Sequence, residues 1–133
     1  MKIRKAKTSD INGCLRLEKL DKGKYWSKKD FNLAIKDKNT IFLVAEEKEI
    51  IGYTLGFTCP TKKTDVMLHE TRTSRRLRKR KIGTSLVNEF CKLAFKKGAR
   101  NIYALIEKEL TSFYVKTCKS KKSQNWLEVK QSK

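Results

Sequence analysis

Apolar residues in this chain recur at two spacings, one typical of β-strands and one typical of amphipathic helices. The run Ile41-Phe42-Leu43-Val44-Ala45 is continuous and of strand length, whereas segment 86–94 repeats its apolar positions at helical spacing. Polar turns separate such segments along the chain. The pattern predicts, in order, strand 3–6, helix 9–20, helix 27–37, strand 41–45, strand 50–57, strand 65–73, a helix ending near 97, strand 102–106, helix 111–119 and strand 126–129.

Capping and turn residues mark where several of these elements begin and end. Ser9 and Ser27 stand immediately before helical patterns, and Asp30 follows Ser27 at the spacing of a capping box. Gly52 and Gly56 lie inside the second strand of a predicted hairpin. Glycines inside a strand indicate a β-bulge or the close approach of another backbone.

The element order β-α-α-β-β-β-α-β-α-β predicts an α/β (α+β) fold with one mixed central sheet. The chain has no internal repeat and no low-complexity linker. At 133 residues it is long enough for a substantial core. We therefore expect residues 1–133 to form a single domain, with a polar tail from about residue 130.

The charge balance is strongly basic. The chain has 33 Lys and Arg against 14 Asp and Glu, which gives a formal net charge of +19. Such a charge attracts polyanions, including nucleic acid and ribosome surfaces. Lysine is nevertheless spread over nearly every segment, so solubility is an alternative explanation for the charge.

Cysteine spacing and hydropathy bear on the compartment. Cys14, Cys59, Cys91 and Cys118 are isolated and lack zinc-type spacing, so we expect reduced thiols and no metal. No secretory signal is visible, and no apolar run is long enough for a membrane span. The expectation is a cytoplasmic protein without membrane contact.

The segment Arg78-Lys79-Arg80-Lys81-Ile82-Gly83-Thr84 is the strongest candidate for chemistry. It follows a predicted strand and leads into the N-terminus of the helix over 86–94. Backbone N–H groups there have no intrahelical partner, and the helix dipole favours an anion. A basic segment at this position is suited to phosphate binding, although such a cluster is often only a solvated surface.

The element order and this segment resemble the GNAT superfamily of acetyl-coenzyme A-dependent N-acetyltransferases. Arg78 to Gly83 falls on the family loop Gln/Arg-x-x-Gly-x-Gly/Ala, and segment 68–73 is similar to the strand that precedes it. Phe113-Tyr114-Val115-Lys116 resembles the family's Phe-Tyr-x-Lys. Trp26-Ser27 is similar to the branch that modifies protein N-termini, which includes the ribosomal-protein alanine acetyltransferases.

The resemblance implies acetyl-CoA as co-substrate and assigns roles to residues. Glu70 is expected to act as general base and Tyr114 to protonate the leaving thiolate. A backbone N–H of the strand 71–73 is expected to polarise the thioester carbonyl. The residues expected to contact the cofactor are Thr71, Arg72, Thr73, Arg78, Lys79, Arg80, Lys81, Ile82, Gly83 and Thr84.

Two local questions accompany these assignments. Lys81 occupies the position of the family's first glycine. Two outcomes are open: its Cβ crowds the pyrophosphate, or its side chain turns outward and the ammonium supports binding. His69 is adjacent to Glu70, so strand alternation places the two on opposite faces and only one can line the site.

The leading prediction is an N-acetyltransferase that acts on a protein or peptide amine. Acetylation of a small amine or polyamine is a second enzymatic version, against which the charge argues because a basic protein repels polycations. The alternative class is a basic module that binds nucleic acid or the ribosome on a degenerate GNAT fold without turnover. The oligomeric state is open.

Overall fold

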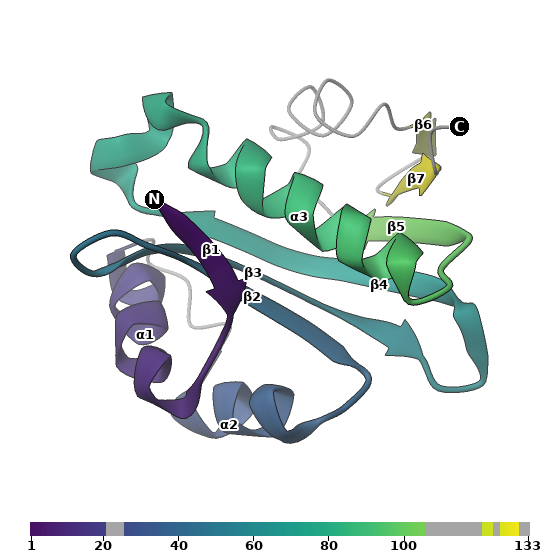
Figure 1. Ribbon diagram of the computed structural model, residues 1–133, viewed down its shortest axis with the longest axis horizontal. Helices are drawn as coiled ribbons and strands as arrows, with labels where there is room; N and C mark the ends of the chain where they lie inside the picture. The colour runs from purple at the N-terminus through teal and green to yellow at the C-terminus, as the bar shows by residue number, and fades with distance from the viewer. Residues whose placement is uncertain (21–25, 106–120, 124–125, 131–133) are drawn as a thin grey trace.

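The computed structural model of the protein describes residues 1–20, 26–105, 121–123 and 126–130. In this part of the chain the strands form one sheet with helices on both faces (Figure 1). The elements are β1 (Lys2–Lys5), the 3-10 helix η1 (Thr8–Asp10), α1 (Ile11–Leu20), α2 (Lys28–Lys36), β2 (Thr40–Glu46), β3 (Ile50–Cys59), β4 (Lys62–Thr73), the 3-10 helix η2 (Arg75–Arg80), α3 (Ile82–Lys96), β5 (Asn101–Leu105), β6 (Lys121–Ser123) and β7 (Trp126–Lys130).

The sheet is mixed, as the sequence predicted. Its strand order over the described residues is β1-β2-β3-β4-β5-β7-β6. Neighbours from β1 to β4 are antiparallel, β4 and β5 run parallel, and β7 is antiparallel to both β5 and β6. The α+β class is therefore confirmed, and β6 is an additional strand that the sequence pattern did not predict. The helix predicted at 111–119 and the tail at 131–133 lie outside the described residues.

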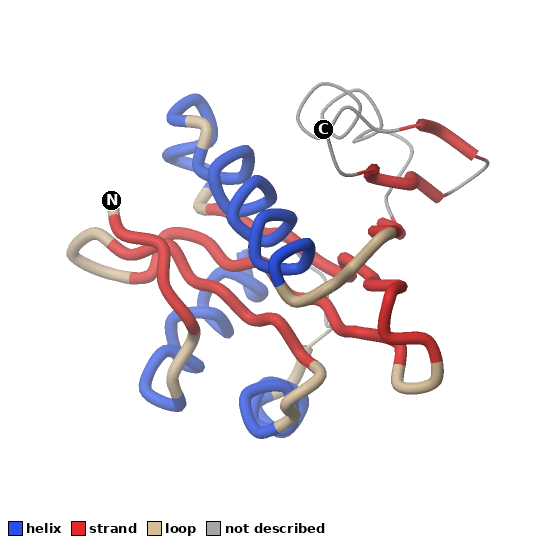
Figure 2. The backbone as a smooth tube through the Cα atoms, turned by 45° about the vertical axis from the view of Figure 1, so that its right-hand side comes forward, coloured by secondary structure: helices blue, strands red, loops and turns tan. Residues whose placement is uncertain are grey.

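The helices form two layers, with α3 on one face of the sheet and α1 and α2 on the other (Figure 2). Under α3, Leu86 and Phe90 are fully buried against strand residues that include Ile102. On the opposite face, the rings of Phe31 and Tyr53 meet edge to face with centroids 5.5 Å apart. Among the described residues, no helix combines the length and apolar character needed to cross a membrane.

The two glycines of β3 let α3 and β4 approach the strand closely. A Cβ on Gly56 would lie 2.2 Å from the Met67 carbonyl oxygen and 2.5 Å from Cζ of Phe90. A Cβ on Gly52 would lie 3.0 Å from Cδ1 of Leu86. The strand register also shifts next to Gly56. Both expectations for these glycines, a bulge and a close backbone approach, are confirmed.

The register shift lies between β3 and β4. Leu55 pairs with Glu70 and the next residue of β3, Gly56, pairs with Leu68, so His69 is an extra residue in β4. An extra residue of this kind locally reverses which side chains face which layer.

The bulge overturns the prediction that His69 and Glu70 face opposite layers. Leu68 belongs to the core under α3. Glu70, two residues later, instead contacts Trp26 on the side of α1 and α2, and the His69 ring also contacts Trp26, with centroids 5.4 Å apart. Strict alternation fails here because β4 contains one residue more than its partner strand.

Of the two predicted N-caps, one is confirmed and one is wrong. The Ser27 hydroxyl accepts from the Asp30 amide at 3.1 Å, and Asp30 accepts from the Ser27 amide at 2.9 Å. Ser9 instead lies inside η1. The first turn there is closed by Asp10, whose Oδ2 accepts from the Lys7 amide at 2.7 Å.

Candidate active site

The basic segment expected to be a loop forms the 3-10 helix η2, which runs directly into α3. Ser74 anchors its start, because the Ser74 amide donates to the Ile51 carbonyl at 2.8 Å. Lys81 ends η2 and precedes α3, and its side chain makes no capping hydrogen bond to the first turn of α3. The N–H groups that begin at Ile82 and Gly83 therefore open a helix whose dipole favours an anion.

Lys81 has a left-handed backbone, with φ 58° and ψ 31°. Glycine adopts this conformation without steric cost, whereas an L-residue incurs about 1–2 kcal/mol. The turn thus has the geometry for which the family uses glycine. The Lys81 side chain is exposed, so it extends into solvent.

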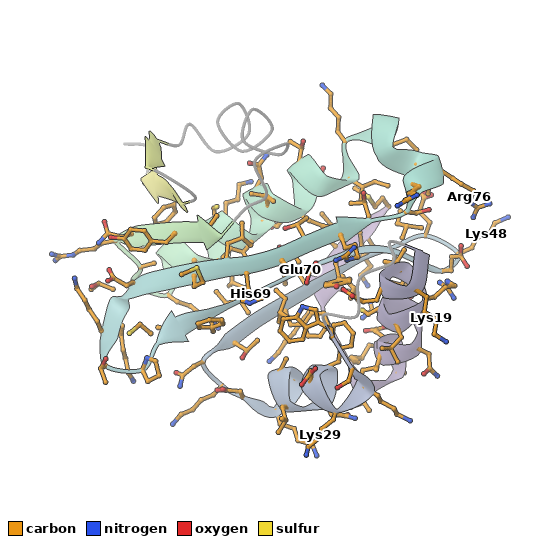
Figure 3. The ribbon with its side chains drawn as sticks, turned by 180° about the vertical axis from the view of Figure 1, so that it is seen from behind. Lys19, Lys29, Lys48, His69, Glu70 and Arg76 are labelled. Carbon is orange, nitrogen blue, oxygen red and sulfur yellow. The ribbon has the colours of Figure 1, made fainter. Side chains whose placement is uncertain are left out.

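Acidic residues of the β2–β3 turn hold the arginines of η2. Both η nitrogens of Arg80 donate to the carboxylate of Glu47, one of them at 2.7 Å. These hydrogen bonds lower the pKa of Glu47 and raise that of Arg80. Arg76 lies 3.5 Å from Glu49, and Figure 3 shows it at the same end of the molecule as Lys48 of this turn. The side chains of Arg78 and Lys79 lie outside the described set.

β4 extends beyond its parallel partner β5. Their pairing ends at Leu68 and Ala104, whereas β4 continues to Thr73 (Figure 1). Thr71 and Thr73 pair with β3 on the other edge, and the Thr71 hydroxyl lies 2.8 Å from that of Thr54. Within the described residues, residues 69–73 of β4 therefore have no strand partner on the side of the strand that faces β5.

Glu70 is fixed by donors to both of its oxygens. The indole Nε1 of Trp26 donates to Oε2 at 2.5 Å, and Nη2 of Arg72 donates to Oε1 at 2.5 Å. The Glu70 side chain is 14% exposed, and Figure 3 labels it beside His69 on β4. It is therefore a preorganised carboxylate, in contrast to a freely solvated strand residue paired with lysines.

Arg72 connects Glu70 to a second carboxylate. Its Nε lies 3.0 Å from Oε1 of Glu18, whose side chain is 4% exposed. The hydroxyl of Tyr53 donates to the same Oε1. Burial raises the pKa of Glu18, and the Tyr53 hydrogen bond opposes that shift. Burial works to lower the pKa of Arg72, but Glu70 and Glu18 outweigh it, so that the pKa lies above its ordinary value.

Trp26 joins the segment before α2 to this network. Its ring stacks on Phe31, with centroids 5.5 Å apart and an interplanar angle of 20°. Trp26 was predicted from the sequence only through its family resemblance, and Glu18 and Tyr53 were not predicted. The available signal was Glu18 on the apolar face of a predicted helix, where a buried carboxylate requires a partner.

The residues present fit acetyl-CoA in two respects. The η2–α3 junction offers backbone amides without a side-chain cap for a diphosphate. The part of β4 beyond its pairing with β5, residues 69–73, carries the carboxylate of Glu70. Tyr114, the expected acid, is outside the described residues. Within the described chain, no group of His, Cys, Asp and Glu has the arrangement of a metal site.

Comparison with known families identifies the class. The sequence profile of the acetyltransferase (GNAT) family matches residues 9–118. The chain belongs to this family, and it is an acetyl-CoA-dependent acetyltransferase. No curated protein matches the chain in sequence.

Solved structures share the fold at low sequence identity. PaiA N-acetyltransferase from Thermoplasma acidophilum, in complex with coenzyme A, has a TM-score of 0.81 and 19% identity, covering 98% of both chains. Aminoglycoside 6'-acetyltransferase type Ii has a TM-score of 0.79 and 20% identity, covering 98% of this chain and 97% of the other. The ribosomal-protein-S18-alanine N-acetyltransferase from Escherichia coli has a TM-score of 0.78 and 8% identity, covering 99% and 96%.

Proposed function

We propose that this acetyltransferase modifies a primary amine of a protein or peptide and that Glu70 is its general base. The observation that carries the proposal is the carboxylate of Glu70, held between Trp26 and Arg72 where β4 extends past β5. A base must have a fixed position relative to the proton it removes. Two donors to one carboxylate supply that position.

The acetyl donor is proposed to occupy the strand end 71–73 and the η2–α3 junction. Backbone groups of Thr71, Arg72 and Thr73 would contact the arm that carries the thioester. The diphosphate would meet the amides at the start of α3, surrounded by cationic side chains. The residues assigned to this second contact are Arg78, Lys79, Arg80, Lys81, Ile82, Gly83 and Thr84.

The chemistry assigns separate tasks to these residues. The acceptor amine loses a proton to Glu70, its nitrogen forms a bond to the acetyl carbon, and the carbon–sulfur bond breaks. The departing thiolate then takes a proton, for which Tyr114 is the proposed donor, since a phenol has an ordinary pKa of about 10. An N–H of the 71–73 strand would stabilise the developing oxyanion.

The net charge of +19 supports a protein or peptide acceptor over a polycation. Trp26 ahead of α2 supports the branch that modifies protein N-termini, and one neighbour in structure is named as a ribosomal-protein alanine acetyltransferase. The small-amine alternative is supported by the aminoglycoside and PaiA acetyltransferases, which have somewhat higher TM-scores and identities than the ribosomal-protein enzyme. The carboxylate of Glu70 also suits an acceptor that arrives as a cation.

Association with RNA or the ribosome is a further part of this proposal, and the net charge supports it. The arginines of η2 are weak candidates for that contact because Glu47 holds Arg80 and Glu49 lies beside Arg76. Exposed lysines elsewhere, including Lys28 and Lys29 at the start of α2, are better placed. Binding that weakens with rising salt would support this association.

An acceptor panel tests the proposed function. The full chain is incubated with acetyl-CoA and one of four acceptors at a time. Two acceptors are peptides: one has a free N-terminus, and the other is the same peptide with a blocked N-terminus and a lysine side chain. The other two are spermidine and an aminoglycoside. Release of free thiol gives the rate, and mass spectrometry locates the added acetyl group. We expect the peptides to be acetylated fastest. Acetylation of spermidine or the aminoglycoside alone would overturn the peptide assignment.

A further inference from the structure

We propose that Glu18 is a positioning residue for acetyl transfer, which holds the guanidinium of Arg72 and, through it, the carboxylate of Glu70 in place. This inference rests on the proposed function, in which Glu70 is the base. Glu18 touches neither substrate nor the reacting atoms. It acts through the guanidinium that lies between the two carboxylates.

The geometry places one cation between two anions. Nη2 of Arg72 donates to Oε1 of Glu70 at 2.5 Å, and Nε of Arg72 lies 3.0 Å from Oε1 of Glu18. The side chains of Arg72 and Glu18 are 11% and 4% exposed, so water screens these charges little. Two carboxylates and one guanidinium give the cluster a net charge of −1.

The second oxygen of Glu18 leaves its charge incompletely neutralised. Oε2 is buried and has no hydrogen-bond partner among the residues that the structure describes. Oε1 has two neighbours, the Tyr53 hydroxyl and the Arg72 guanidinium. A carboxylate that served only to close an ion pair would be expected to have both oxygens satisfied. The remaining negative potential acts on Arg72 and, beyond it, on Glu70.

The effect on Glu70 has a definite sign. Burial contributes most to raising the pKa of Glu18, and the negative charge of Glu70 adds to the rise, so the two carboxylates repel each other. Removing the charge of Glu18 would leave Arg72 paired with Glu70 alone. Removal of one of two repelling negative charges should therefore move the acidic limb of the pH–rate profile toward lower pH.

The other groups around Glu70 do not compensate for Glu18. Tyr53, on β3, has its pKa raised by burial and by the two carboxylates, so it stays neutral. His69 contacts Trp26 at the exposed edge of the cluster. Arg72 thus contacts Glu70 directly, and Glu18 in turn contacts Arg72.

The test is the pH dependence of kcat at saturating acetyl-CoA and acceptor, measured on the full chain. Glu18→Gln keeps the shape and an oxygen acceptor for Tyr53 but removes the charge. We expect the acidic limb of its profile to move to lower pH by about one unit, the size of a shift from one nearby charge. The plateau rate should fall about tenfold because Arg72, and with it the carboxylate of Glu70, is held less firmly.

Asp10→Asn is the matched control, since Asp10 is another buried carboxylate paired with an arginine, Arg4, on the same face. It should lower stability and leave the acidic limb in place. The double variant Glu18→Gln/Arg72→Gln restores the net charge to −1 and should return the limb toward that of the natural protein. A double variant whose limb stays at the lower pH overturns the proposal, even where Glu18→Gln alone does not fold.

Glu70→Gln distinguishes an error in the assignment of Glu70 as the base from an error in the role of Glu18. If Glu70→Gln keeps the natural rate and limb, the assignment of the base is wrong. If Glu70→Gln is inactive but folded Glu18→Gln keeps the natural limb, only the role of Glu18 is wrong. A limb that moves to lower pH in Glu18→Gln and not in Asp10→Asn supports the positioning role.

Discussion

The indole nitrogen of Trp26 donates a hydrogen bond to the carboxylate of Glu70, 44 residues further along the chain. This bond connects the segment before α2 to the part of β4 that extends beyond its pairing with β5. It depends on the β-bulge at His69, which turns Glu70 toward α1 and α2. The candidate base is thus set in place by a local irregularity of one strand and an aromatic residue from another layer.

Removing only the donor of this bond should lower activity more than stability. Trp26→Phe keeps an aromatic ring against Phe31 but loses the N–H. A hydrogen bond to a charged group contributes about 1.5–3 kcal/mol, so we expect kcat/KM to fall about tenfold or more. Steady-state kinetics and the thermal unfolding midpoint measure both effects. An unchanged kcat/KM would show that this bond does not position the base.

Lys81→Gly should stabilise the protein. Glycine adopts the left-handed backbone without the steric cost of a Cβ, which stabilises the folded state. Because glycine also has more conformational freedom in the unfolded chain, the net increase in the free energy of unfolding should be about 1 kcal/mol. Urea unfolding followed by circular dichroism would measure it. Lys96→Gly, in the last turn of the regular helix α3, is the opposite control and should destabilise. A loss of stability in Lys81→Gly would contradict the backbone assignment at this residue.

Alanine substitutions at the two glycines of β3 should lower the free energy of unfolding to different extents. Gly56→Ala would place a Cβ 2.2 Å from the backbone oxygen of Met67, which cannot move aside without shifting β4. We expect a loss of about 3 kcal/mol in the free energy of unfolding. Gly52→Ala meets its nearest atom at 3.0 Å, the tip of the Leu86 side chain, and should cost less. Equal unfolding midpoints for both variants would contradict the described packing.

The ion pair between Arg4 and Asp10 predicts the pH dependence of stability. Hydrogen bonds from Arg4 lower the pKa of Asp10 below its ordinary value of 3.8. The pair therefore stabilises the fold at neutral pH, and this contribution is lost as the pH falls from about 4 through the lower folded-state pKa.

Asp10→Asn should accordingly be less stable than the natural protein by about 2 kcal/mol at pH 7. The difference should narrow in acid as the natural carboxyl becomes protonated. Denaturant unfolding of both proteins at pH 7 and near pH 3 measures this. A difference that grows toward low pH would contradict the proposed cause.

Much of the fold follows from the sequence because local signals coincide with the packing. The apolar run 41–45 forms β2, the Ser27–Asp30 pair caps α2, and helical spacing after Ile82 forms α3. Each of these signals lies within a few residues of the structure it specifies. The short helix expected to carry Tyr114 is beyond the described residues.

Less of the candidate active site could be predicted from the sequence, and the reason is physical. The bulge at His69 arises from the pairing of two strands, and a one-residue register shift leaves no mark in either strand alone. The Glu18–Arg72–Glu70 cluster joins positions far apart in sequence through side chains. Strand alternation, applied to β4 as if it were regular, therefore placed His69 and Glu70 on opposite faces.

The η2–α3 junction is the proposed binding site for the diphosphate of the acetyl donor. Calorimetric titration of the full chain with acetyl-CoA, beside Gly83→Trp, tests it directly. Leu33→Trp, at an exposed position on α2 in the other layer, is the matched control for a bulky ring. We predict saturable binding by the natural protein and Leu33→Trp, and no measurable heat of binding from folded Gly83→Trp. Undiminished binding by Gly83→Trp, or none by the natural protein, would contradict the account.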